Sequence, residues 1–280
     1  AAALRLGGSH AQQAALLPKI AAGEAIFALC VDEGAHHDPR KTALTAEKSD
    51  DGYVLNGYKH FVADGHIADW LIVAARTPSG IGLFVVAADA AGVSRQTLST
   101  IDSRGAADIR LAGVRIGAND IQPWAHGDGS AQLDQVLDRA RIGLAAEMHG
   151  QAESMFAQTA DYLKTPTQFG QLIGSFQGLQ HRAGKKLGDL ELTKSCVLAA
   201  LAILDENKSD KIIAEFASLA KARASDTLHT VSNEMVQMHG GIGMTDAHDS
   251  GLDLKRARVA DALYGGASFH RDRYASLTGF

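Results

Sequence analysis

The sequence predicts an α+β fold in which an antiparallel β-domain is followed by a helical bundle. Between residues 24 and 128, short and partly β-branched runs are separated by turn residues, with no long helical pattern between them. From residue 129 to residue 280, apolar residues recur instead at spacings of three and four, which is typical of helices. We therefore expect a helical remnant (1–22), a middle β-domain (23–128) and a C-terminal helical domain (129–280).

The β-domain contains candidate strands that are short and regularly interrupted. They lie at 26–31, 42–47, 53–55, 59–62, 70–75, 83–87, 93–98 and 109–116. Because parallel strands need long crossover connections, usually helical, we expect an antiparallel barrel or sandwich. The Asn56-Gly57 pair predicts a type I′ hairpin, since both residues tolerate positive φ.

The C-terminal half contains segments with helical periodicity at 133–163, 176–207, 210–239 and about 252–277. Each is about 25 residues or longer, beyond the common helix length. Long helices joined by short loops predict an antiparallel four-helix bundle. Near the start, the run 12–20 around Pro18 looks like the end of another helical unit. The chain begins with alanines and has no initiator Met, so we expect the natural protein to begin earlier.

Composition excludes several classes of function. Apolar residues make up 46% of the chain and charged residues 21%, which is enough for a folded core. The net charge of −5 gives no basic excess for nucleic acid. Cys30 and Cys196 are too few for a disulfide framework or a thiolate zinc cluster, and they suit a cytoplasmic protein. The longest apolar run, 197–204, is too short for a membrane span, and no signal-peptide pattern is present.

Three local motifs have simple structural interpretations. The His36-His37-Asp38 run is read as a loop, because adjacent side chains rarely converge on one metal ion. The glycine-rich run 240–243 follows a helix, so it is not a βαβ dinucleotide fingerprint. It is either a helix end with a left-handed glycine or an open backbone that a ligand phosphate or ribose approaches closely. The Gln168-Phe169-Gly170 run, taken alone, is a tight turn with one packed Phe.

Taken in chain order, these segments resemble the acyl-CoA dehydrogenase family. The matching runs are 8–24 at the end of the family's N-terminal helical domain, Leu29-Cys30-Val31-Asp32-Glu33-Gly34-Ala35 in its flavin-side β-loop, Tyr53-Val54-Leu55-Asn56-Gly57-Tyr58-Lys59 in its "xxxNGxK" hairpin, Gln168-Phe169-Gly170-Gln171 with 173–181 in its helix-loop signature, and Gln237-Met238-His239-Gly240-Gly241-Ile242-Gly243 in its late glycine motif. The resemblance implies an acyl-CoA dehydrogenase-like fold whose N-terminal helical domain is largely missing from this chain.

The resemblance also implies a reaction and a cofactor. In this family a carboxylate removes the proton α to a thioester, and the β-hydrogen leaves as hydride to FAD. The substrate is an acyl-CoA and the product a 2-enoyl-CoA of lipid metabolism. Family members form dimers or pairs of dimers, in which each FAD is completed by the neighbouring subunit.

Site residues follow from the resemblance position by position. Contacts to the neighbouring subunit's FAD are expected from Gln237, Gly240, Gly241, Phe169 and Gln168. The flavin edge is expected beside Val31, Asp32 and Phe61, and pantetheine or CoA beside Asp138 and Arg141. A Thr or Ser is usual in place of Asp32, and a carboxylate there repels an electron-rich reduced flavin.

Several catalytic positions depart from the family. Gly265 stands where the family's usual Glu base lies, and Ala140 occupies the second position that some members use. Ala63 replaces the hydroxyl residue beside the flavin. Pro166 replaces an Arg that clamps the cofactor, and losing such a charge-assisted bond costs roughly 1.5–3 kcal/mol. Losing a general base costs roughly 10²–10⁴ in rate.

These departures favour a heteromeric enzyme in which a sister subunit carries the base. Some bacterial members that act on steroid side chains are α₂β₂ complexes of this kind, and the resemblance extends to them. Two alternatives remain open. One is a self-sufficient dehydrogenase, homo-oligomeric, with a relocated base such as Glu147 or Asp246. The other is a non-catalytic scaffold without FAD, or an acyl-CoA-binding protein.

Overall fold

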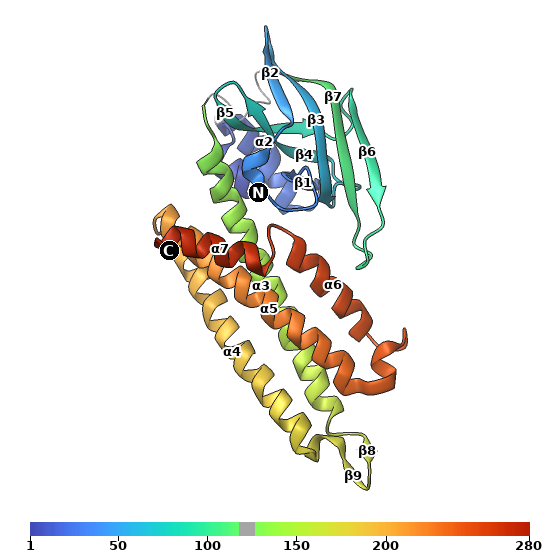
Figure 1. Cartoon of the computed structure of the whole chain (residues 1–280). Helices are drawn as coiled ribbons and strands as arrows, with labels where there is room; N and C mark the ends of the chain where they lie inside the picture. Colours follow the sequence, from blue (N-terminus) through green and yellow to red (C-terminus); the bar gives the residue numbers. More distant parts are fainter. Residues whose placement is uncertain (118–126) are drawn as a thin grey trace. The chain divides into compact units, whose positions relative to one another are not determined.

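A β-rich unit precedes a helical unit, as the sequence predicts (Figure 1). The computed structural model describes residues 1–117 and 127–280. These divide into two compact units, Ala1–Leu137 and Asp138–Phe280. The expected middle domain of 23–128 includes residues 118–126, which lie outside the described part of the chain. Helix α3 (Ser130–Tyr162) begins in the first unit and continues through the second.

Two short helices open the first unit, α1 (Ala2–Gly7) and α2 (His10–Ala21). Ser9 begins α2 with a capping box: its Oγ accepts the Gln12 N–H at 3.2 Å, and Gln12 Oε1 accepts the Ser9 N–H at 3.0 Å. The helical pattern predicted around Pro18 is confirmed, with Pro18 inside α2.

One sheet forms the rest of the first unit, in the strand order β1-β4-β2-β3-β7-β6, with β5 paired to β4. Its strands are β1 (Phe27–Cys30), β2 (Thr45–Ser49), β3 (Gly52–Ala63), β4 (Trp70–Thr77), β5 (Gly80–Ala87), β6 (Val93–Leu98) and β7 (Ala106–Gly117). β1 and β4 are parallel, and β2 pairs with β4 in parallel at Thr45 and Arg76, so the purely antiparallel expectation is wrong at these pairs. The connection from β1 to β4 runs through the short 3-10 helix η1 (Pro39–Lys41) and the β2–β3 hairpin instead of a long helix, which is why helical periodicity gave no sign of it.

The Asn56-Gly57 hairpin prediction is also wrong. β3 passes straight through this pair, and the β2–β3 turn lies between Ser49 and Gly52 instead. At Asn56 the register with β7 shifts, and Asn56 Oδ1 accepts the Gly113 N–H at 2.7 Å. A Cβ on Gly57, whose φ is +146°, would lie 2.8 Å from Leu44. The extra residue at this register shift is Gly113 of β7, so the β-bulge lies in β7 opposite Asn56, and Gly57 permits the close approach of the Leu44 backbone.

The second unit is mainly helical, and its long helices surround one apolar core. Its elements after α3 are β8 (Thr167–Gln168), β9 (Gln171–Leu172), η4 (Ile173–Ser175), α4 (Gln177–Asp205), α5 (Asp210–His239), η5 (Gly240–Met244), α6 (Ser250–Ala262) and α7 (Ala267–Thr278). The three long predicted helices are confirmed. The predicted fourth helix, 252–277, is wrong, because Tyr264 (φ +57°) and Gly265 (φ +100°) break it into α6 and α7.

Within residues 1–117 and 127–280, no helix has both the length and the apolar character that a bilayer crossing needs.

Candidate functional site

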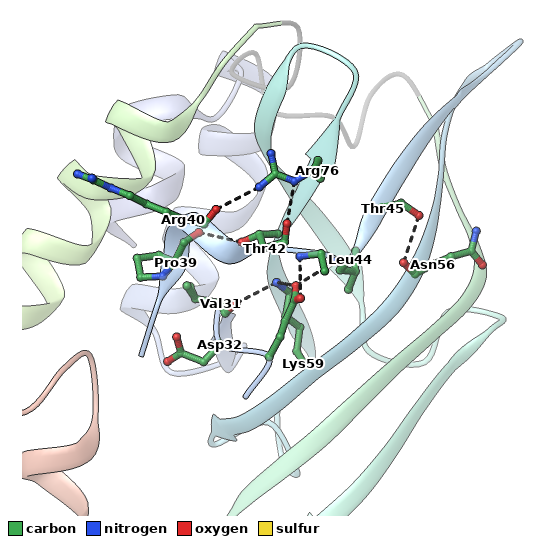
Figure 2. Close-up of polar contacts among 12 residues, drawn as sticks. Val31, Asp32, Pro39, Arg40, Thr42, Leu44, Thr45, Asn56, Lys59 and Arg76 are labelled. Atoms are coloured by element: carbon green, nitrogen blue, oxygen red, sulfur yellow. Dashed lines mark hydrogen bonds and ion pairs between the residues drawn. The ribbon is translucent and has the colours of Figure 1, made fainter. Parts of the chain in front are cut away.

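The loop after β1, where the resemblance places the flavin edge, is fixed by an ion pair whose lysine, Lys59, is fully buried (Figure 2). Lys59 Nζ donates to the Val31 carbonyl at 2.9 Å and to Glu33 Oε1 at 2.6 Å. Glu33 also accepts the backbone N–H groups of Ala43 and Leu44, at 2.7 and 3.0 Å. Burial lowers the pKa of the Lys59 ammonium, and the Glu33 carboxylate opposes that shift. One lysine therefore ties the loop to the sheet.

Asp32 is engaged within its own loop. His37 Nδ1 lies 2.8 and 2.9 Å from the two Asp32 carboxylate oxygens. The His37 side chain is 3% exposed, whereas that of Asp32 is 26% exposed. The sequence places a carboxylate at this point of the loop, but it gave no sign that the neighbouring histidine would turn inward to hold it.

Phe61 lies at a second irregularity of β3. Its φ is +50°, a region that non-glycine residues rarely adopt, and the register with β7 shifts between Lys59 and Val62. The Phe61 N–H donates to Asp108 Oδ1 at 3.1 Å, and His60 Nδ1 lies 2.7 Å from the same oxygen. The carboxylate of Asp108 thus replaces a missing ladder partner and holds Phe61 in a costly backbone conformation.

In the second unit, the turn between α6 and α7 contains the position expected for the base. That position is Gly265, which is buried. Lys221 Nζ donates to the Gly265 carbonyl at 3.0 Å, the Asp261 carbonyl at 3.1 Å and Ser225 Oγ at 3.2 Å. Burial lowers the pKa of Lys221 to about 8. All three ammonium protons are used inside the protein, so Lys221 fixes the backbone of this turn.

Tyr264, the residue before it, is held by two further groups. Arg141 Nε donates to the Tyr264 carbonyl at 3.3 Å, and His270 Nε2 donates to the same oxygen at 3.1 Å. His270 is fully buried, and burial, followed by the charges of Arg141 and Lys221, lowers its pKa to about 2. Arg141 and Lys221 therefore hold the turn with hydrogen bonds to its carbonyl groups, and the buried His270 beside them stays neutral. Neither Lys221 nor His270 was predicted from the sequence.

Asp138 and Arg141, the expected pantetheine or CoA contacts, pair with each other in the structure. Arg141 Nη1 lies 2.9 Å from Asp138 Oδ1, and Arg273 contacts both carboxylate oxygens at 2.7 and 3.0 Å. Asp138 is 3% exposed and Arg141 is 0% exposed. Through Arg273, this pair connects α3 to α7. The role of Asp138 and Arg141 toward a substrate stays a prediction.

The candidate positions for a relocated base differ in their surroundings. Ala140, half-buried on α3, has no ionisable group. Glu147 Oε1 accepts from Arg256 Nη2 at 2.6 Å and from Nε at 3.0 Å. Asp246 is exposed in the segment between η5 and α6. The Glu147 carboxylate is thus committed to an ion pair, which makes it a poor general base.

The glycine-rich run begins where α5 ends. Gly240 ends the helix with φ +62° and ψ −137°, so its φ is positive as expected, but its ψ lies outside the left-handed helical region that was expected. No atom would lie within 4 Å of a Cβ on Gly240 or Gly241, and Gln237 is exposed one turn earlier. The His239 ring below them packs 4.2 Å from the Tyr162 ring at the end of α3. The result is an open backbone on a rigid support, which suits close approach of a phosphate or ribose.

The expected tight turn at Gln168-Phe169-Gly170 is present, but the expectation of a packed Phe is wrong, because Phe169 is on the surface. Phe169 (φ +54°) and Gly170 (φ +80°) form the two-residue turn that joins β8, which contains Gln168, to β9. The Phe169 side chain is 92% exposed, although its ring meets the edge of Phe176 at 6.2 Å. Other exposed apolar residues of the helical unit include Leu172, Ile242 and Met244. Phe169 and Leu172 belong to the same hairpin, so its tip exposes two large apolar side chains.

The structure thus has a β-sheet unit and a helical unit. The helical unit exposes an open backbone at Gly240 and Gly241 and the aromatic ring of Phe169. Two family models match the chain: "Acyl-CoA dehydrogenase, C-terminal domain" over residues 127–276 and "Acyl-CoA dehydrogenase, middle domain" over residues 30–114. The chain belongs to the acyl-CoA dehydrogenase family.

Curated relatives include the mitochondrial short/branched chain specific acyl-CoA dehydrogenase of Bos taurus, 28% identical over 93% of this chain and 61% of its own length. The mitochondrial long-chain specific enzyme of Mus musculus is 30% identical over 93% of this chain and 62% of its own. The chain thus spans about three fifths of the length of these relatives.

Solved structures agree with this assignment. An acyl-CoA dehydrogenase from Geobacillus kaustophilus superposes with a TM-score of 0.91 at 25% identity, over 99% of this chain and 75% of its own. The ChsE4-ChsE5 complex from Mycobacterium tuberculosis gives a TM-score of 0.90 at 25% identity, over 100% and 74%. The steroid ACAD Tcur3481-Tcur3483 gives 0.88 at 30% identity, over 99% and 73%.

Proposed function

We propose that this chain is a subunit of an FAD-dependent acyl-CoA dehydrogenase and that a related sister subunit supplies the catalytic carboxylate. The observation that carries the proposal is Gly265. In the position expected for the base, this chain has a buried glycine with φ +100°. Of the alternative positions, Ala140 is not acidic and Glu147 is paired with Arg256, which leaves the exposed Asp246 as the remaining candidate for a relocated base.

The proposed reaction is α,β-dehydrogenation of an acyl-CoA thioester to a 2-enoyl-CoA. A carboxylate of the sister subunit accepts the proton from the α-carbon, and the pair of electrons from that C–H bond forms the new double bond as hydride leaves the β-carbon. FAD, when bound, supplies the hydride acceptor. A well-placed base of this kind contributes roughly 10²–10⁴ in rate, which this chain alone lacks.

Residues of the helical unit fit the role of completing a neighbour's cofactor site. The open backbone at Gly240 and Gly241 admits a pyrophosphate, and the exposed Gln237 amide supplies hydrogen bonds. Phe169 offers an exposed ring for packing, with Gln168 beside it. Gln237 and the two glycines are exposed at the end of α5, and Phe169 is exposed in the β8–β9 hairpin, as a site shared between subunits requires.

The flavin-side loop of this chain fits a cofactor less well. Val31 presents its carbonyl to Lys59, and Asp32 adds a negative charge where a hydrogen-bond donor would serve a reduced flavin. Phe61 retains an aromatic ring, but Ala63 supplies no hydroxyl. We therefore propose that this chain mainly completes the sister subunit's FAD site and contributes less to a site of its own.

The names of the structural relatives support a class of substrate and a type of assembly. Two of the structural relatives are named as a two-protein complex or a steroid ACAD, which supports a heteromeric α₂β₂ assembly acting on a steroid or other lipid acyl-CoA. Asp138 and Arg141 would shape the pantetheine end indirectly, because both are buried. We place the complex in the cytoplasm, since both cysteines are free thiols.

The visible spectrum of the purified complex tests the proposal. We expect this chain to be colourless when produced alone and to become part of a yellow, active complex when produced with a related chain that keeps an intact Tyr-Glu-Gly-Thr run. A yellow, active homo-oligomer of this chain alone would refute the proposal. In that case, loss of turnover with retained flavin in Glu147→Gln or Asp246→Asn would identify a relocated base. A complex without flavin absorbance would favour the scaffold alternative.

A further inference from the structure

We propose that Phe269 occupies the space in which a catalytic side chain at residue 265 would lie, so that this chain is closed to a base rather than merely lacking one. The functional meaning of this inference rests on the proposed function, whereas its physical content is a contact between two residues of the helical unit. Phe269 lies in the first turn of α7, four residues after Gly265.

The contact is severe. A Cβ on Gly265 would lie 2.4 Å from Cδ1 of the Phe269 ring and 3.0 Å from both Cε1 and Cγ. Such distances are well inside van der Waals contact between carbon atoms, for which the optimum is about 3.5–4.0 Å. Since even one methyl group overlaps the ring, the longer side chain of a glutamate needs the ring to move.

The ring is held in place by its neighbours. Arg141 Cζ lies 5.6 Å from the Phe269 ring centroid, within the range of a cation–π interaction. The His270 ring packs against it edge-on, with centroids 5.1 Å apart. Arg141 is itself fixed by Asp138 at 2.9 Å. Moving Phe269 therefore disturbs a buried charged cluster.

The backbone of the turn is held from the other side. Lys221 binds the Gly265 carbonyl, and Arg141 and His270 bind the Tyr264 carbonyl. The φ of +100° at Gly265 is itself a conformation that favours glycine. With ring and backbone both fixed, restoring the acidic residue by a single substitution fails for steric reasons.

A double-substitution cycle in thermal unfolding of the full chain tests the contact. We expect Gly265→Ala to lower the Tm of the helical unit's transition by roughly 5–15 °C, from overpacking and backbone strain together. In the Phe269→Ala background the same change lowers the Tm by about half as much or less, because only the strain remains. Phe269→Leu serves as a second background in case the alanine variant folds poorly.

Gly266→Ala is the matched control. Gly266 has φ −80°, and a Cβ there would lie 3.5 Å from the nearest Asp261 oxygen, an ordinary contact. Its effect on the Tm is therefore small and equal in both backgrounds. The inference is overturned if Gly265→Ala is tolerated, or if its cost is the same with Phe269 present and removed. Because the cycle reads stability, its result is independent of the flavin spectrum that tests the proposed function.

Discussion

His270 shows how a single residue is shaped by its surroundings in the helical unit. The side chain is fully buried beside Arg141, Lys221 and Arg273, and its ring hydrogen-bonds the Tyr264 carbonyl. Burial first, and then these positive charges, lower its pKa to about 2. The imidazole is therefore neutral throughout the physiological pH range. A protonated ring in this place would add a buried positive charge beside Arg141, Lys221 and Arg273.

This residue predicts an acid-sensitive stability. In the unfolded chain His270 binds a proton below its ordinary pKa of about 6.5, whereas the folded chain excludes that proton down to about 2. The unfolded state therefore binds more protons between these values, and stability falls as the pH falls through 6.5. We expect a loss of about 2 kcal/mol from this residue between pH 7.5 and pH 5, measured by urea unfolding.

His270→Gln keeps a donor near the Tyr264 carbonyl and removes the titrating group, so the variant should lose less stability than the wild type over that range. Exposed His181→Gln is the control and should leave the pH profile unchanged. A parallel loss in wild type and His270→Gln would contradict the assignment.

Residues of this kind mark the limit of prediction from the sequence. Gly265 and Ala140 were identified from the family pattern, because a missing acid is visible in a linear motif. Lys221, His270 and Phe269 were not, because their roles arise from α5 and α7 meeting around one turn. A buried lysine or histidine carries no sequence mark that separates it from an exposed one.

At the scale of elements, a prediction was correct where neighbouring residues in the sequence determine the structure, and wrong where distant residues do. Helix α5 begins and ends where its periodicity and its glycine predict, at Asp210–His239. The Asn56-Gly57 hairpin prediction failed because Gly57 lies within β3 close to the Leu44 backbone, and the Asn56 side chain bonds the bulged Gly113 of β7. Long-range packing thus overrides a strong local turn preference.

The β8–β9 hairpin gives a prediction at this scale. Phe169 has a positive φ and a 92% exposed side chain, so it suits neither its turn position nor the solvent. Asn is favoured at this φ in a two-residue turn. We expect Phe169→Asn to leave the Tm equal or raised by about 1–3 °C, while weakening flavin retention by the complex.

The two readouts separate the roles of Phe169. The matched control is Leu172→Asn in the adjoining β9, which removes exposed apolar area without relieving a positive φ. It should therefore show no gain in Tm. A clear fall in the Tm of Phe169→Asn would mean that the Phe169 ring stabilises the fold. A binding partner would then not be needed to explain why the ring is there.

At the scale of the whole molecule, the two units have separate apolar cores. One core is formed by sheet residues such as Leu55, Val73 and Phe84, and the other by helical residues such as Met148, Leu228 and Met235. Units with their own cores commonly unfold as separate steps. We therefore predict that calorimetry of the chain resolves two transitions.

Two substitutions identify the transitions. Lys59→Met leaves the half-buried Glu33 carboxylate without its cation, a change that costs up to about 3–5 kcal/mol when both groups are fully buried, and it should lower only the transition of the β-sheet unit. His270→Gln should reduce the acid sensitivity of the other transition alone. If both variants instead shift one common transition, the units fold cooperatively. The fixed flavin-side loop at Lys59 and the closed turn at Gly265 would then have to be treated as parts of a single stability unit.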